Sequence, residues 1–302
     1  MTRRYAVLDV FTDKPLAGNA LAVVFDAAGL DDERMQAIAR EFNLSETVFV
    51  FPPERPVHSA RLRIFTPEHE LPFAGHPTVG TALALARQKL GEAGGETILV
   101  LEEKVGPVRC AAFVKGPAHG HAIFDLPRRP EAVEAKLDRD ALAAALGLTP
   151  GEIGFENHVP SVFTAGSPYL FVPVRHLDAI VLAHAVAAQW DAALGSTSHA
   201  MYLYCRQTLI ADNQFHARCF APGAGIKEDP ATGGAAAAFA GVVGRFDELP
   251  SGSHRVVIEQ GFEMKRPSLI TLEIDIENGE VAAARIGGDA VIVAEGTLDL
   301  GP

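Results

Sequence analysis

The chain has 302 residues, of which 48% are hydrophobic and 21% are charged, and its formal net charge at pH 7 is −12. This length and composition indicate a globular protein with a sizeable core, built as two average domains or one large one. The negative net charge, without any basic run, argues against a nucleic-acid partner. It does not exclude a small anionic substrate, which needs only local positive potential.

The cysteines and the hydropathy pattern further restrict the kinds of site and the cellular location that we expect. Cys110, Cys205 and Cys219 are scattered and have no metal-type spacing, so they predict neither a disulfide framework nor a zinc site. No apolar stretch approaches the ~18 residues of a membrane span, and no signal-peptide pattern follows the first residues. We therefore expect a cytoplasmic protein with reduced thiols and no membrane contact.

The first half alternates short apolar strands with two helices. Strands are expected over residues 5–10, 21–25, 47–50, 60–65, 97–102, 108–114 and 121–126. A helix is expected over residues 32–42, because Asp31 suits its N-cap and the apolar residues share one face. A second helix is expected from His76 to about residue 88.

The proline- and arginine-bearing residues 127–130 are the expected link between two domains. The predicted boundaries are residues 1–127 and 128–302, with the final strand returning to the first domain as an alternative. The second half is expected to contain helices over residues 139–146, 183–190 and from Thr232 to about 243, and strands over 169–174, 200–205, 214–220, 255–259, 268–276, 280–286 and 290–295.

One helix in each half consists almost wholly of small and apolar residues. Residues 79–86 and 235–243 have almost no polar face, and a helix that is apolar all round must be buried. We therefore predict strands wrapped around a central buried helix, twice over.

Each of these two helices follows a glycine-flanked polar residue. Helix starts offer unpaired N–H groups and a positive dipole end, which favour anions. His76 is expected at the N-cap because Pro77 suits the first helical position, and Asp229 is expected to cap the second helix. His76 and Asp229 are either substrate contacts or structural caps, and Gly233 and Gly234 allow either ligand approach or close helix packing.

Glu46 stands at the mouth of an apolar strand. The functional interpretation is a general acid and base in a site that excludes water. The structural interpretation is a solvated carboxylate at a helix-to-strand turn.

The familiar cofactor and nucleophile motifs are missing from the sequence. It contains no H-E-x-x-H, P-loop, G-x-G-x-x-G or G-x-S-x-G, and residues 68–70 are typical of a surface tract rather than a metal site. The sequence therefore predicts no metal and no nucleotide cofactor.

Segments 45–49, 63–67, 70–78 and 228–233 together resemble the PhzF-like family of phenazine biosynthesis isomerases. Segments 11–12, 18–19, 260–261, 266–268 and 286–288 fit as well, so the match covers nearly the whole chain in order. The resemblance implies an α+β, diaminopimelate-epimerase-like fold. In that fold two similar domains, each a mostly antiparallel sheet rolled around a central buried helix, place the active site between them. It also implies a homodimer without a cofactor.

The resemblance further implies roles for individual residues. Glu46 corresponds to the glutamate that moves a proton from C3 to C1 of trans-2,3-dihydro-3-hydroxyanthranilate. His76 and Asp229 correspond to residues that position the substrate. The full set of implied binding residues is Asn19, Gly75, His76, Asp229, Thr232, Gly233 and Gly234.

Two departures from relatives bear on function. Epimerases and racemases of this fold use a cysteine at each central helix start, and this chain has none there, which argues against a two-thiol mechanism. Gly234 stands where the family usually has serine, which leaves the substrate open. We expect a cofactor-independent isomerase acting on a small anionic metabolite. A non-catalytic binding or scaffold protein is the alternative, and lyase or hydrolase chemistry with the same carboxylate is a third.

Overall fold

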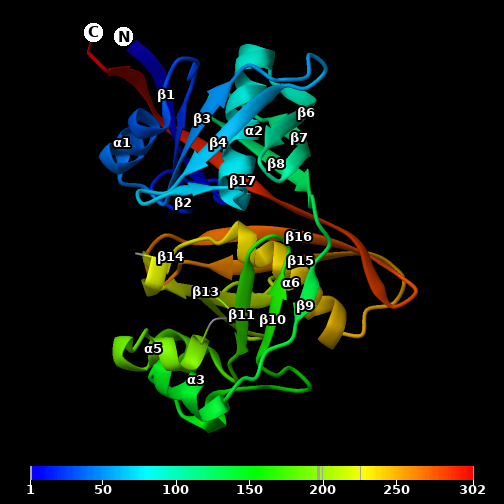
Figure 1. The fold of residues 1–302 in the computed structure, drawn as a ribbon. Helices are drawn as coiled ribbons and strands as arrows, with labels where there is room; N and C mark the ends of the chain where they lie inside the picture. The colour runs from blue at the N-terminus through cyan, green and yellow to red at the C-terminus, as the bar shows by residue number, and fades with distance from the viewer. Residues whose placement is uncertain (1, 196–197, 199, 225, 302) are drawn as a thin grey trace. The chain divides into compact units, whose positions relative to one another are not determined.

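The computed structural model describes residues 2–195, 198, 200–224 and 226–301. The chain divides into two compact units, which Figure 1 shows in ribbon form. Unit 1 comprises Met1–Pro127 and Ile286–Pro302, and unit 2 comprises Arg128–Arg285.

Unit 1 is built mainly from strands. These are β1 (Thr2–Val10), β2 (Asn19–Val24), β3 (Glu46–Phe51), β4 (Ala60–Phe65), β5 (Glu70–Leu71), β6 (Gly95–Glu103), β7 (Gly106–Val114), β8 (His119–Asp125) and the C-terminal part of β17 (Glu280–Asp299). The pairs β2–β3 and β4–β6 are parallel, and β1–β2, β3–β4, β6–β7 and β7–β8 are antiparallel. Strand β17 pairs with both β8 and β1, so the succession of pairs returns to its start and forms a closed ring.

Helix α2 (Gly75–Leu90) packs against β1, β2, β3, β6, β7 and β8 of this ring. It is buried from Gly75 to Ala84 and at Ala86, as the lack of a polar face predicts. Helix α1 (Asp32–Phe42) has the predicted bounds, and the predicted cap is confirmed because Asp31 Oδ1 accepts a hydrogen bond from Arg34 N at 2.8 Å.

Unit 2 repeats the succession of strand pairs. Its strands are β9 (Glu131–Val133), β10 (Ser161–Thr164), β11 (Pro168–Pro173), β12 (Met201–Cys205), β13 (Phe215–Ala221), β14 (Ile226–Asp229), β15 (Gly252–Gln260) and β16 (Ser268–Glu277). The pairs β11–β12 and β13–β15 are parallel, and β10–β11, β12–β13 and β15–β16 are antiparallel. The same order of parallel and antiparallel pairs runs from β1 to β7 in unit 1.

Helix α6 (Gly233–Phe246) is the buried helix of unit 2 and contacts β9, β10, β11 and β16. The other helices of this unit are α3 (Arg139–Leu146), α4 (Leu177–Leu182) and α5 (Ala187–Leu194). Three short 3-10 turns, Gly91–Ala93, Pro150–Glu152 and Pro222–Ala224, complete the described elements. Among the helices described in either unit, none is long and apolar enough to cross a membrane.

Two expectations about secondary structure were wrong. The strands expected over residues 280–286 and 290–295 form one continuous strand, β17. Gly287 does not turn the chain there. A Cβ at this position would lie 2.8 Å from Ala122 O of β8, so the glycine permits close strand contact instead.

The helix expected over residues 183–190 was also wrong. The backbone is extended at Ala183, which ends α4, and a new helix, α5, begins at Ala187. Between them His184 N and Val186 N donate to the carbonyls of Leu146 and Ala145, so α3 takes these hydrogen bonds away from a continuous helix.

Substitution of Gly80 tests how closely α2 packs against the surrounding strands of unit 1. A Cβ at this position would lie 2.6 Å from Leu21 Cδ2 and 2.8 Å from Val10 Cγ2. We expect Gly80→Ala to lower the free energy of unfolding by about 1–2 kcal/mol, since overpacking outweighs the gain in helix propensity. Urea denaturation measures this change.

The control is Gly116→Ala in the β7–β8 turn, where a Cβ would meet nothing within 4 Å. Its effect should stay within about 0.5 kcal/mol. An equal effect of the two substitutions would contradict the packing account.

Candidate functional site

In unit 1 the predicted residues Asn19, Glu46 and His76 come together, and we call them the unit-1 cluster. Asn19 is the first residue of β2 and Glu46 is the first residue of β3. Because these strands are parallel neighbours, both side chains lie at the same edge of the sheet. His76 is the second residue of α2.

The geometry of the unit-1 cluster centres on the imidazole ring. Glu46 Oε2 lies 3.2 Å from His76 Nε2, and Asn19 Nδ2 lies 3.4 Å from His76 Nδ1. The side chains of His76 and Glu46 are only 4% and 13% exposed. Both ring nitrogens of the histidine therefore contact polar side chains in a nearly dry environment.

Burial fixes the charge of this histidine. It lowers the pKa of His76 to about 3, against a smaller opposing effect of a hydrogen bond with the Ala20 backbone. The ring is therefore neutral at physiological pH. The carboxyl group of Glu46 thus lies beside an uncharged imidazole ring.

The predicted cap of α2 was wrong. Ala74, in an extended conformation, holds the N-cap position without a side-chain hydrogen bond, and the helix begins at Gly75. His76 therefore lies inside the first turn. Its ring is free of a capping role and turns toward Asn19 and Glu46.

Glu103 at the end of β6 is a buried carboxyl group that the sequence reasoning missed. Thr78 Oγ1 lies 2.8 Å from both Glu103 Oε1 and Ala74 O, although a hydroxyl has one proton to donate. Burial raises the pKa of Glu103 to about 8. A protonated Glu103 therefore donates to Thr78, which donates to Ala74 at the start of α2.

The alternation of residues along β6 could have identified Glu103 in the sequence as a buried acid. Alternate residues Leu99, Leu101 and Glu103 all lie on the buried face of β6. A carboxyl group in phase with buried leucines indicates an acid that remains neutral.

The pKa of Glu103 predicts how stability depends on pH. The folded protein keeps this proton between about pH 4.5 and pH 8 while the unfolded chain releases it, so the free energy of unfolding falls as pH rises through this window. Glu103→Gln keeps a neutral donor and removes the effect. We expect the stability of the variant, relative to the parent protein, to rise by up to about 1.4 kcal/mol per pH unit.

Urea denaturation of both proteins at pH 5 and pH 8 measures this difference. A stability difference that is the same at both pH values would contradict a neutral, buried Glu103.

In unit 2 the predicted residues Asp229, Thr232, Gly233 and Gly234 gather with Gln260, and we call these five the unit-2 cluster. Thr232 Oγ1 donates to Asp229 Oδ2 at 2.7 Å. Gln260 Nε2 donates to Asp229 O at 2.7 Å and to Thr232 Oγ1 at 3.0 Å, while Thr232 N donates to Gln260 Oε1 at 3.2 Å. These bonds fix the loop that leads into α6.

The predicted N-cap role of Asp229 was wrong. Thr232 holds the N-cap position of α6, and Asp229 ends β14. The Asp229 side chain is bonded to the threonine hydroxyl instead. Gln260 is a further residue that chemistry-based reasoning missed, although segment 260–261 contributes to the family resemblance.

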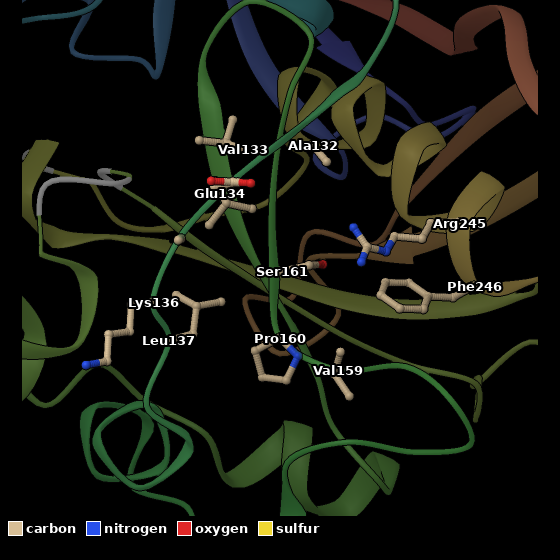
Figure 2. Close-up of a pocket in the computed structure, with 12 residues that line it drawn as sticks. Ala132, Val133, Glu134, Lys136, Leu137, Val159, Pro160, Ser161, Arg245 and Phe246 are labelled. Atoms are coloured by element: carbon tan, nitrogen blue, oxygen red, sulfur yellow. The ribbon is translucent and has the colours of Figure 1, made fainter.

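Neither the unit-1 cluster nor the unit-2 cluster borders the pocket of unit 2 described here. A pocket of about 730 Å³ in unit 2 is bordered by the segments around Ser161, Glu134 and Arg245 (Figure 2). None of the predicted site residues lines it.

The tract at residues 68–70 has no metal-site character. Glu70 binds Arg63 through two hydrogen bonds of 2.7 and 2.6 Å and Lys104 through one of 2.6 Å. Throughout the described part of the chain, no group of three or more His, Cys, Asp and Glu side chains is arranged to hold a metal ion.

The family model described as phenazine biosynthesis-like protein, PhzC-PhzF, matches residues 8–296. The chain belongs to this family. It is 52% identical over 301 residues to an uncharacterised isomerase of Mesorhizobium japonicum, covering 98% of this chain and 99% of that protein. It is 35% identical over 297 residues to the trans-2,3-dihydro-3-hydroxyanthranilate isomerase of Pseudomonas fluorescens, covering 98% and 99% of the two chains.

A solved structure supports the same assignment. The Bacillus anthracis phenazine biosynthesis protein of the PhzF family aligns with a TM-score of 0.87 at 27% identity, covering 99% of this chain and 100% of that one. The resemblance drawn from the sequence motifs is therefore confirmed, and both of the relatives described above are named as isomerases.

Proposed function

We propose that this protein is a cofactor-independent isomerase in which Glu46 moves a proton on a small anionic metabolite. The observation that carries the proposal is the position of Glu46 beside a buried, neutral histidine. A carboxylate that takes up a proton and returns it to a neighbouring atom needs a site that excludes water, and the side chain of Glu46 is only 13% exposed.

Comparison with other carboxylates of unit 1 supports this role. Glu70 is held by Arg63 and Lys104, and Asp289 is held by Lys115 at 2.9 Å. Against the opposing effect of burial, Arg63 and Lys104 lower the pKa of Glu70, and hydrogen bonds with His121 and Lys115 lower the pKa of Asp289 to about 2. Glu46 instead lies 3.2 Å from His76, whose ring is uncharged.

The cysteines support a carboxylate rather than a thiol as the proton carrier. Cys110, Cys205 and Cys219 are all buried. Burial raises the pKa of each thiol, that of Cys205 to about 12, so none supplies a thiolate at neutral pH.

The substrate class rests on the relatives and on the two helix starts. One relative is named for trans-2,3-dihydro-3-hydroxyanthranilate, a small carboxylate. We infer that Asn19, Gly75, His76, Asp229, Thr232, Gly233 and Gly234 bind a substrate of this kind. The repeated strand order further supports two diaminopimelate-epimerase-like domains, with boundaries near residues 127 and 286. We expect the enzyme to act as a cytoplasmic homodimer.

Glu46→Gln tests the proton transfer. The substitution keeps the shape of the side chain but removes its acid–base function, so turnover of trans-2,3-dihydro-3-hydroxyanthranilate should fall by about 10²–10⁴-fold. Binding should remain nearly intact. Mass spectrometry of deuterium incorporated from D2O measures the transfer, and isothermal titration calorimetry measures the binding.

Glu70→Gln is the matched control, because this carboxylate of the same unit is held by Arg63 and Lys104. It should keep the parent rate. Full activity of Glu46→Gln would overturn the proposal.

A non-catalytic binding protein is the second candidate, favoured by the glycine at position 234. The parent protein distinguishes the two functions when cyclic amino-hydroxy acids are screened by thermal shift. Ligands that bind but never gain solvent deuterium would support the non-catalytic function.

A further inference from the structure

Four side chains of unit 2 lie along one face of its sheet. Tyr202 on β12 is directly opposite Cys219 on β13, and Cys219 is opposite Asp229 on β14. Tyr169 on β11 lies on the same face, because Phe171, two residues further along that strand, is opposite Tyr202. This face packs on α6, since the rings of Phe171 and Tyr202 contact Phe239 of that helix.

The phenol of Tyr169 lies against the backbone at the start of α6. A Cβ placed on Gly234 would come within 2.8 Å of Tyr169 Oη, and within 3.6 Å of Cε2 and Cζ. The hydroxyl oxygen alone makes the contact too close, since 3.6 Å is ordinary van der Waals distance. A side chain at position 234 would therefore require the Tyr169 hydroxyl to shift.

A second hydroxyl nearby indicates that a polar partner belongs here. Tyr202 is fully buried, and its Oη has no hydrogen-bond partner among the described residues. Burial and the neighbouring Cys219, Asp229 and Tyr169 raise its pKa well above the ordinary value, so it stays a neutral donor. A buried hydroxyl without a hydrogen-bond partner destabilises the fold, and a polar ligand atom or a water would offset that cost.

We propose that Tyr169 is a specificity-determining residue that presents its hydroxyl to a substrate carboxylate at the start of α6. Gly234 leaves the space that this hydroxyl occupies. The inference rests on the proposed function for the class of substrate, but not on the proton transfer by Glu46. The hydroxyl and the amide groups of the first turn of α6 then act on the same anion.

Moving the hydroxyl group from position 169 to position 234 tests the proposed role of Tyr169. The probe is 3-hydroxyanthranilate, an aromatic carboxylate with no proton transfer to undergo, and calorimetric titration measures its affinity. Tyr169→Phe should weaken binding by about 10-fold, through the loss of one hydrogen bond to a charged group. Gly234→Ser alone should also weaken binding, because the new side chain overlaps the Tyr169 hydroxyl.

The double variant Tyr169→Phe, Gly234→Ser provides the decisive comparison. With the phenol oxygen gone, the serine Cβ meets only carbons at 3.6 Å, and its own hydroxyl replaces the missing donor. Affinity should return to within about 3-fold of the parent protein. Thermal unfolding should show the same rescue in the absence of any ligand.

Tyr204→Phe is the matched control, because this buried tyrosine on the same strand as Tyr202 already bonds His158 Nδ1 at 3.0 Å. It should lower the melting temperature and leave affinity unchanged. Unaltered binding by Tyr169→Phe, failure of the double variant to recover, or no binding of the probe to the parent protein would each overturn the inference. Because the probe undergoes no turnover, these outcomes are independent of the Glu46→Gln result.

Discussion

Close packing of a helix of small residues against surrounding strands is the constraint on which both units depend. Gly80 of α2 lies against Leu21 and Val10, and Gly241 of α6 lies against Phe163, where a Cβ would come within 2.5 Å of a ring carbon. Side chains at these positions would push the strands outward. The unit-1 and unit-2 clusters lie at the starts of these two helices.

Burial then determines which ionisable groups carry charge. The same loss of water keeps His76 neutral and keeps Glu103 protonated, although one is a base and the other an acid. Glu103 reaches the start of α2 through Thr78, so a neutral acid stabilises the turn that contains His76. Where an opposite charge is in direct contact, as for Arg63 with Glu70 at 2.6 Å, that contact offsets the cost of burying a charged group.

The sequence predicted most strands from their hydrophobic periodicity, and α1 from its periodicity and its cap. It predicted the two buried helices from their apolar composition, although the caps expected for them were wrong. It was insufficient where tertiary contacts override local signals. The break expected between residues 286 and 290 is replaced by a continuous strand in which Gly287 permits a close strand contact, and residues 183–186 bond to α3 instead of continuing a helix. At the site, the family motifs identified Asn19, Glu46 and His76. The pairing of Tyr169 with Gly234 joins residues far apart in the chain, which local pattern does not reveal.

The repeated strand order has a stereochemical consequence. Glu46 opens β3 opposite Leu21, and the residue that opens β12 opposite Leu170 in unit 2 is Met201. A thioether neither accepts nor donates a proton in water, so the duplication supplies one acid–base group at this position rather than two. Two such groups would favour inversion at carbon, as in a racemase. With Glu46 alone as the proposed carrier, the proton returns to the face it left, and part of an isotopic label on the substrate travels with it to the product.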